Sequence, residues 1–301
     1  MKPLADATRI DDENFRAALR AWIDEFHGQI RPYSELETVR RVDSYIRQED
    51  QYREKVRFVL DMFSQRNERP QRVLDLGSSA GGLAVALAQA GLNVQGVEPS
   101  AAGVAAAEIR ALRCGVTAAS FQVGVGEALP YGDQAFDLVV SVAVLEHVQN
   151  VERVVRETFR VLKPGGYAYF EVPNYLFPFE PHYKIAWVPM MPKGIGKLYA
   201  KARGANPAFL DDLNYMNIWI VRRAFSHAGF VDIQDFYAQY LAGKASGASW
   251  AGGAARRVPS NGEVACGFLS GRWCGRSVPA GGWVVCGAAG VLAAAVVPGG
   301  G

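Results

Sequence analysis

The chain has 301 residues, half of them hydrophobic, and a formal net charge of +2. This length can bury one large core, which favours a single domain with small additions. Residues 1–242 carry 27 basic and 29 acidic side chains and no long basic run, so nucleic acid is disfavoured as a partner. The N-terminus lacks an apolar stretch of signal-peptide length, and only Cys114 precedes residue 243, so we expect a cytoplasmic location.

Two amphipathic patterns precede the first expected strand. Residues 11–27 and 36–63 place apolar side chains at helical spacing, which predicts two helices. We expect residues 1–66 to form an N-terminal helical cap on one edge of a sheet. The alternative is that Tyr52 and Arg53 reach over a ligand site.

The stretch Arg72–Ser100 predicts a buried strand, a tight turn, a helix and a second strand. Gly77 and Gly81 lack side chains, so the backbone can bend sharply there and a ligand can lie against it. Glu98 ends the second strand, where its carboxylate can accept hydrogen bonds from both hydroxyls of a ribose. The pattern therefore predicts a nucleoside site.

The spacing of the turn argues against a nicotinamide cofactor. That fingerprint needs Gly-x-Gly-x-x-Gly, whereas this turn reads Asp75-x-Gly77-x-Ser79-x-Gly81. A carboxylate beside the turn would repel a pyrophosphate and suits an ammonium or sulfonium better. These residues resemble the first motif of the class I S-adenosylmethionine-dependent methyltransferases, with Ser79 where the middle glycine is usual.

Residues 120–123 predict a third strand, and the loop over residues 124–131 follows it. The loop resembles the family's Gly-Asp-Ala-Glu-x-Leu-Pro-Phe segment, in which the aspartate meets the adenine amino group. Val125 stands in place of that aspartate. The resemblance implies adenine contact from the backbone of Gly126 and from Glu127.

Residues 136–141 predict a buried fourth strand, and the segment that leaves its end resembles the fourth motif of the type 11 methyltransferase group. His147 in this segment is the candidate proton acceptor, because its ordinary pKa lies near neutrality. The alternative is a histidine at a helix start that bonds a nearby carbonyl. The resemblance implies that the cofactor site consists of Asp75, Gly77, Ser79, Gly81, Glu98, Pro99, Gly126, Glu127 and Ala143.

A helix over residues 151–162, a Lys-Pro-Gly-Gly turn and a fifth strand over residues 167–172 complete the resemblance. Residues 173–215 are rich in proline and aromatic residues and too long for a plain connection, so we expect a lid inserted after the fifth strand. Its aromatic side chains either pack among themselves or line an acceptor pocket. Residues 230–237 predict the sixth strand.

The composition changes at residue 243. Residues 243–301 hold 15 of the 32 glycines and three of the four cysteines, contain no aspartate and show no clear period. Such a composition is typical of translation in a wrong reading frame. We expect this atypical low-complexity tail to be largely unstructured or weakly packed, and the sheet to lack a well-formed final strand drawn from it.

The expected fold is an α/β three-layer sandwich around a mostly parallel, Rossmann-like methyltransferase sheet, with the methyltransferase domain over residues 67–242. The resemblance implies S-adenosylmethionine as cofactor and O-, N- or C-methylation of a small-molecule acceptor that is apolar, quinone-like or sugar-like. No metal or covalent nucleophile is expected, and no membrane span. Two other functions remain open: a non-catalytic binding or regulatory protein that keeps the fold, and a nicotinamide-dependent oxidoreductase.

Overall fold

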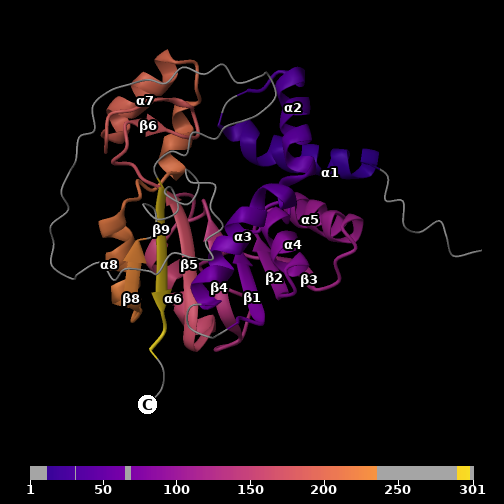
Figure 1. The fold of residues 1–301 in the computed structure, drawn as a ribbon. Helices are drawn as coiled ribbons and strands as arrows, with labels where there is room; N and C mark the ends of the chain where they lie inside the picture. Colours follow the sequence, from indigo (N-terminus) through magenta and orange to yellow (C-terminus); the bar gives the residue numbers. More distant parts are fainter. Residues whose placement is uncertain (1–11, 31, 65–68, 236–289, 299–301) are drawn as a thin grey trace, which may run out of the picture.

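The computed structural model describes residues 12–30, 32–64, 69–235 and 290–298, and its centre is a seven-stranded sheet in the order β3-β2-β1-β4-β5-β9-β8 (Figure 1). The pairings among the first five strands are parallel, and β9 runs antiparallel to both of its neighbours. The predicted mostly parallel sheet is therefore confirmed. The strands are β1 Arg72–Leu76, β2 Asn93–Glu98, β3 Ala119–Val123, β4 Phe136–Val142, β5 Leu162–Pro173, β8 Val231–Asp235 and β9 Gly290–Val296.

Strand β9 corrects the prediction for the C-terminal tail. Gly290–Val296 lies between β5 and β8, where the sheet was expected to lack a strand. Its seven residues carry no charge, so the strand can pair on both edges without burying an ion. The backbone continues this pairing at Val297, whose N–H and C=O bond Gly166 and Gly165. The prediction for residues 243–289 lies outside the described residues.

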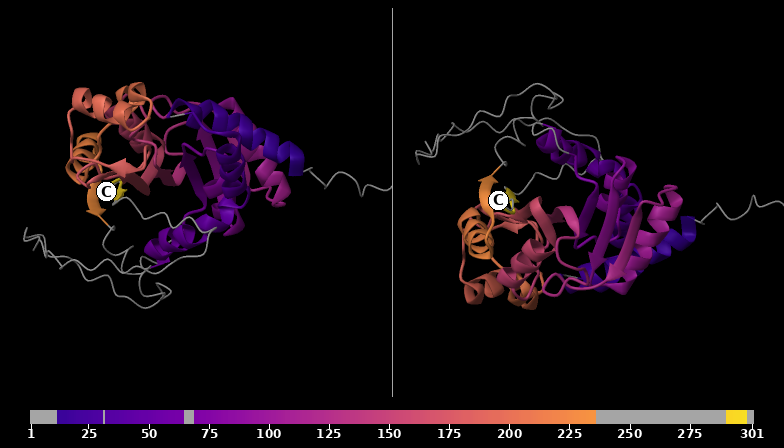
Figure 2. Two further views of the ribbon diagram at one scale, coloured as in Figure 1. Left: turned by 90° about the horizontal axis from the view of Figure 1, so that it is seen from above. Right: turned by 90° about the horizontal axis from the view of Figure 1, so that it is seen from below.

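Helices cover both faces of the sheet and make the three layers (Figure 2). On one face, α3 Gln48–Ser64 and α4 Gly82–Gln89 pack on strand residues such as Val73 and Val140. On the other, α6 Val151–Val161 and α8 Ile218–Ala228 pack on residues such as Leu74 and Val139. Successive strand residues thus serve opposite faces, as the two-residue period of a strand requires.

The N-terminal cap has three helices where the sequence predicted two. They are α1 Asp12–Phe26, α2 Glu35–Ile46 and α3, with a short 3-10 turn, η1 His27–Gln29, after α1. The expected second helix breaks at Arg47, whose φ and ψ angles of −117° and 41° are not helical. At this break the buried side chain of Arg110, in α5 Ala101–Arg113, donates to the carbonyls of Tyr45 and Ile46 and pairs with Glu49. These contacts satisfy carbonyls that the end of a helix leaves without an intrahelical partner.

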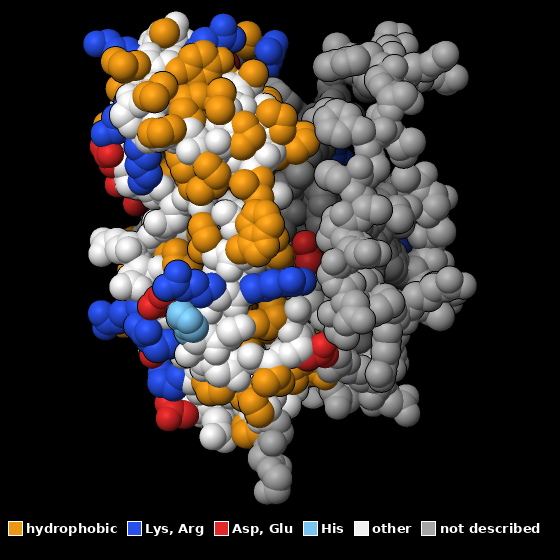
Figure 3. Space-filling model, turned by 90° about the vertical axis from the view of Figure 1, so that its left-hand side faces the viewer, with side chains coloured by type: hydrophobic (Ala, Val, Ile, Leu, Met, Phe, Trp, Pro, Cys, Tyr) orange, Lys and Arg blue, Asp and Glu red, His pale blue; other side chains and the backbone are white. Residues whose placement is uncertain are grey.

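Residues 173–215 form a separate small unit at the carboxyl ends of the parallel strands (Figure 1). It holds the hairpin β6 Phe179–Glu180 and β7 Ile185–Ala186, then α7 Lys193–Ala202 and the 3-10 helix η2 Pro207–Asp212. Most of its inner side chains pack together, and the cap joins them through Ile30. Its exposed apolar side chains include Ile195 and Leu198. Hydrophobic side chains gather over the upper part of the face drawn in Figure 3.

Candidate active site

The turn after β1 holds three of the residues that the sequence singled out. Gly77 and Gly81 have φ angles of 75° and 77°, a region that glycine enters without strain. A Cβ atom on Gly77 would lie 2.3 Å from a methyl carbon of Val144, so this turn lies against the segment that follows β4. Ser79 also has a positive φ, 54°, which costs a residue with a side chain about 1–2 kcal/mol.

Glu98 ends β2, and its carboxylate faces this turn. Its Oε2 accepts the N–H of Ser79 at 2.9 Å, and its Oε1 accepts the N–H of Ser100 at 3.3 Å. Burial raises the pKa of Glu98, the two N–H groups oppose the rise, and the neighbouring Glu25 adds to it. Glu25 belongs to α1 and accepts the Ser100 hydroxyl at 2.9 Å. Helix α1 therefore contributes a second carboxylate that the sequence did not predict.

Asp75 lies at the end of β1 with 2% of its surface exposed. Burial raises the pKa of its carboxyl to about 7; a hydrogen bond from the backbone of Ala84 opposes the rise, and the charge of Glu98 adds to it. The Oδ2 atom has no hydrogen-bond partner among the described residues. Tyr52 interacts electrostatically with Asp75, whereas Arg53 is exposed and pairs with Asp50 at 2.7 Å. Of the two cap residues considered above, only Tyr52 thus lies on the Asp75 side.

The loop after β3 leads back toward the start of α6. One carboxylate oxygen of Glu127 accepts the N–H groups of Gln149 and Asn150 at 2.8 and 3.2 Å. Glu127 thus holds the segment that starts α6, and its contact with a cofactor stays a prediction, as does that of Gly126. Val125 is 46% exposed, and its side chain offers no acceptor for an amino group.

The segment after β4 places Ala143, Glu146 and His147 at the carboxyl end of the sheet. Ala143 is exposed, with a φ of 56°, and Glu146 is fully buried. Asn214, from the end of the inserted unit, fixes this turn: its N–H donates to the carbonyl of Glu146 at 2.7 Å, and its side-chain amide donates to two further carbonyls of the turn. The inserted unit therefore helps to position His147.

The inserted unit also brings a second histidine to the first. The Nε2 atoms of His147 and His182 lie 3.2 Å apart. On its other side, His182 Nδ1 lies 2.7 Å from Oε1 of the buried Glu180, which also accepts the hydroxyl of Tyr175 at 3.2 Å. Glu146 adds a carboxylate oxygen 3.9 Å from His147 Nε2. Burial raises the pKa of Glu146 to about 7, and both of its carboxylate oxygens lack hydrogen-bond partners among the described residues.

Aromatic rings enclose the two histidines. Phe26 of α1 meets His147 edge-on, with ring centres 5.5 Å apart, and Phe209 of η2 lies 5.9 Å from His147 and 5.5 Å from His182. The cluster thus draws on the cap, the end of β4 and the inserted unit. The sequence identified His147, but it gave no signal that would have selected Glu146, Glu180 and His182 as its neighbours.

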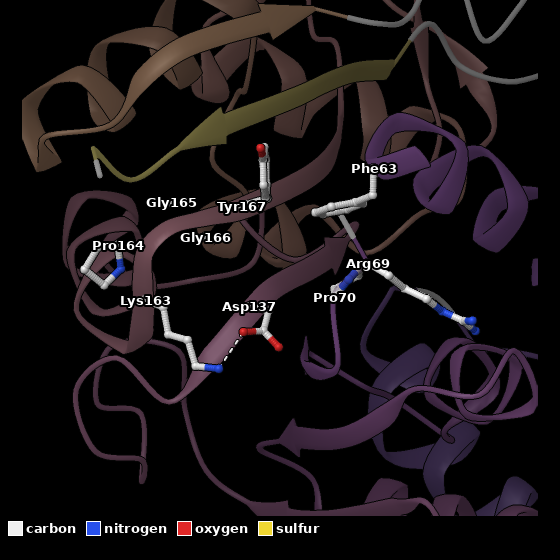
Figure 4. Close-up of a pocket in the computed structure, with 9 residues that line it drawn as sticks. All are labelled: Phe63, Arg69, Pro70, Asp137, Lys163, Pro164, Gly165, Gly166 and Tyr167. Atoms are coloured by element: carbon white, nitrogen blue, oxygen red, sulfur yellow. Dashed lines mark hydrogen bonds and ion pairs between the residues drawn. The ribbon is translucent and has the colours of Figure 1, made fainter. Parts of the chain in front are cut away.

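A surface cavity at the opposite ends of the strands is distinct from this site. Its lining comes from the amino ends of the strands and includes Arg69, Asp137, Lys163 and Tyr167 (Figure 4). Lys163 Nζ lies 2.5 Å from Asp137 Oδ1, and the other oxygen of Asp137 accepts two backbone N–H groups. Its carboxylate is fully engaged, in contrast to those of Asp75 and Glu146.

Comparison with known proteins finds a matching domain family and several methyltransferase relatives. Residues 74–170 match the family described as "Methyltransferase domain". A ubiquinone biosynthesis O-methyltransferase of Pseudomonas fluorescens (strain SBW25) is 36% identical over 107 residues, which cover 35% of this chain and 45% of that protein. A protein of the same name from Chelativorans sp. (strain BNC1) is 28% identical over 205 residues, covering 65% of this chain and 78% of that protein.

A norajmaline N-methyltransferase of Rauvolfia serpentina is 37% identical over 115 residues, covering 38% of this chain and 39% of that protein. The chain spans somewhat less than half the length of the curated relatives that it matches at higher identity. These matches support the predicted S-adenosylmethionine-dependent methyltransferase family for residues 74–170. Within the described residues, no helix is both long and apolar enough to span a bilayer.

Proposed function

Because residues 74–170 form a class I S-adenosylmethionine-dependent methyltransferase domain, we propose that this chain methylates a small-molecule acceptor. One observation carries the proposal. The turn that holds Gly77 lies against Val144, two residues before Glu146 and three before His147. The expected nucleoside site therefore lies next to the cluster of Glu146 and the two histidines, and a transfer reaction requires donor and acceptor sites to be adjacent.

The nucleoside side fits the cofactor. Oδ2 of Asp75 is buried without a partner and would accept an ammonium group. Glu98, held by two backbone N–H groups, keeps lone pairs for the hydroxyls of a ribose. The absence of a Cβ at Gly77 lets this turn pack directly against Val144. When bound, S-adenosylmethionine supplies a methyl group already activated by its sulfonium, for in-line displacement at the methyl carbon.

The chain's own task is to hold the acceptor, exclude water and receive a proton. Positioning of two reactants can contribute about 7–11 kcal/mol to a reaction barrier. Phe26 and Phe209 give the cluster apolar walls, which support an acceptor with an apolar or aromatic body. His147 as the proton acceptor stays a prediction, and its position in this cluster supports it.

The cellular location is a separate proposal. We propose a reducing cytoplasm, because Cys114 is the only cysteine in residues 1–242 and it is not in a disulfide. The inserted unit over residues 173–215 is proposed to act as the acceptor lid, since it supplies His182 and the turn-fixing Asn214.

Calorimetry and a labelled methyl donor test the function. We expect the full chain to bind S-adenosylmethionine and no nicotinamide cofactor, and to transfer labelled methyl groups to members of a panel of phenols, quinols, amines and sugars. Binding without transfer to any acceptor, in the panel or in a metabolite extract, would favour the non-catalytic alternative. Tight binding of a nicotinamide cofactor instead would overturn the proposal.

A further inference from the structure

Glu146, His147 and His182 form a compact cluster at the acceptor side of the site. The ligand atoms of Glu146, His147 and His182 all lie within 4.8 Å of one another. Two come from the turn after β4, and one comes from the inserted unit, 35 residues away in the chain. We propose that Glu146, His147 and His182 bind a divalent transition-metal cation of the Zn²⁺ or Mn²⁺ kind, which binds the acceptor oxygen in an open position.

The spacing of the two histidines fits such a cation. Two nitrogen ligands at about 2.1 Å from a metal, with an angle of 90–110° between them, lie about 3.0–3.4 Å apart. The observed separation of the Nε2 atoms of His147 and His182 is 3.2 Å. The carboxylate of Glu146 lies 3.9 Å from His147 Nε2, and all three ligand atoms lie within 4.8 Å of one another, so a movement of about 1–1.5 Å would complete three ligands on one side of the cation.

The burial of Glu146 supports the cation independently of the distance between the histidines. Its side chain is fully buried, and neither carboxylate oxygen has a hydrogen-bond partner among the described residues. A buried carboxylate without a partner is costly, and a metal ion is one of the few groups that offset this cost. A bound cation would supply the missing partner for Glu146 and ligate both histidines at once.

The surroundings of His182 resemble those of a metal ligand. A carboxylate can only accept, so the contact of 2.7 Å with Glu180 requires a proton on His182 Nδ1. In the neutral ring, Nε2 then carries the lone pair that faces His147. Glu180 is itself held by the N–H of Tyr183 and the hydroxyl of Tyr175. Such a carboxylate–histidine pair orients metal ligands in many proteins.

Two imidazoles and one carboxylate favour a borderline transition metal over Mg²⁺ or Ca²⁺, which prefer oxygen ligands. The inference rests on the proposed function for its chemical role. The cation would lower the pKa of a bound acceptor hydroxyl. The O–H bond breaks, its proton leaves to water, and the oxygen's electron pair forms the bond to the methyl carbon as the sulfur keeps the pair of the broken C–S bond. His147 is then a ligand rather than the proton acceptor.

Metal titration of the full chain tests the site. After treatment with a chelator, we expect calorimetry with Zn²⁺ to show one equivalent bound with a dissociation constant below about 1 µM. Glu146→Gln and His182→Asn should each weaken binding by about 10–100-fold or more. His227→Asn is the matched control, because His227 is exposed and also lies near a glutamate, Glu152 at 4.0 Å, but outside the cluster.

Two further measurements separate the possible outcomes. Co²⁺ bound at this site should lack the near-ultraviolet absorption of cobalt–thiolate bonds, which excludes the tail cysteines as ligands. Binding of S-adenosylmethionine should be the same in both variants as in the unaltered chain. If the unaltered chain does not bind S-adenosylmethionine but binds Zn²⁺ as expected, the proposed function is wrong and the metal site stands. Zn²⁺ binding weaker than about 100 µM, or equally tight in the variants and in the control, would overturn the metal site and leave a hydrogen bond between two histidines.

Discussion

Asp75 offers the sharpest test of how the chain recognises a positively charged ligand. Its carboxyl is buried, with a pKa of about 7, so it is about half protonated at neutral pH before the ligand binds. A cationic group beside Oδ2 favours the ionised form and lowers this pKa. Binding of S-adenosylmethionine should therefore release a proton, and affinity should fall as the pH drops below about 7. Between pH 7.0 and 5.5 we expect a loss of about tenfold.

Asp75→Asn should abolish this dependence. The variant keeps the shape of the side chain but loses a charged hydrogen bond, which costs about 1.5–3 kcal/mol of binding free energy. Calorimetry in two buffers with different ionisation enthalpies counts the released protons, and a pH below about 7.5 avoids titration of the ligand's own amino group. Glu98 also has a raised pKa, and any dependence that persists in Asp75→Asn would report Glu98. Equal affinity at pH 5.5 and 7.0, with no proton release, would refute the role of Asp75.

The same shift has a consequence for the ligand-free chain. The folded-state pKa of Asp75, about 7, lies above the ordinary value of 3.8. The folded state therefore binds this proton more tightly, so the contribution of Asp75 to stability is fully present below about pH 4 and is lost as the pH rises through 7. The full shift corresponds to about 4 kcal/mol. Asp75→Asn should remove this part of the decline, which thermal unfolding at pH 5 and pH 8 would measure.

Three further predictions concern the turn, the ribose carboxylate and the last strand. Gly77→Ala should weaken cofactor binding and lower stability, because the new Cβ would overlap Val144 and the φ angle of residue 77 is positive. The double variant with Val144→Ala should recover part of the stability in thermal unfolding. If it recovers none, the whole effect comes from the backbone conformation. Glu98→Ala should weaken S-adenosylmethionine binding by about 1.5–3 kcal/mol in calorimetry, and a loss below about twofold would contradict the ribose assignment. Val297→Asp, directly after β9, should destabilise the fold by about 3 kcal/mol or more in denaturant unfolding, because Val297 is 6% exposed and lies in the core. The control Val231→Asp, at a residue that is 48% exposed, should change the unfolding free energy little. Equal effects of the two variants would show that the chain at β9 does not pack in this core.

The parts of the fold that depend on local pattern were predictable from the sequence. Buried strands, the Gly77–Gly81 turn and Glu98 at a strand end follow from short stretches in which composition and spacing agree. The long N-terminal pattern failed for a non-local reason. Arg110 donates to the carbonyls of Tyr45 and Ile46 at the break, and nothing within the helical pattern itself shows that a residue 65 positions away binds there.

The candidate site was predictable on its nucleoside side and only in part on its acceptor side. Asp75, Gly77 and Glu98 belong to one strand–turn–helix–strand unit, so their proximity follows from chain order. His182 and Glu180 reach His147 through the packing of an insertion whose path has no local rule. Glu25 reaches Ser100 because α1 packs on α5, which is again a tertiary contact.

Strand β9 shows why a departure in composition is not a guide to structure residue by residue. The tail was judged by its average, rich in glycine and without aspartate, and by the absence of alternation. A strand paired on both edges has its backbone groups satisfied, and an uncharged run of seven residues brings no charge that would have to be buried there. Antiparallel entry beside β5 also covers an edge that would otherwise present free N–H and C=O groups. Gly290–Val296 meets these requirements, and it pairs with β5 on one side and with β8 on the other.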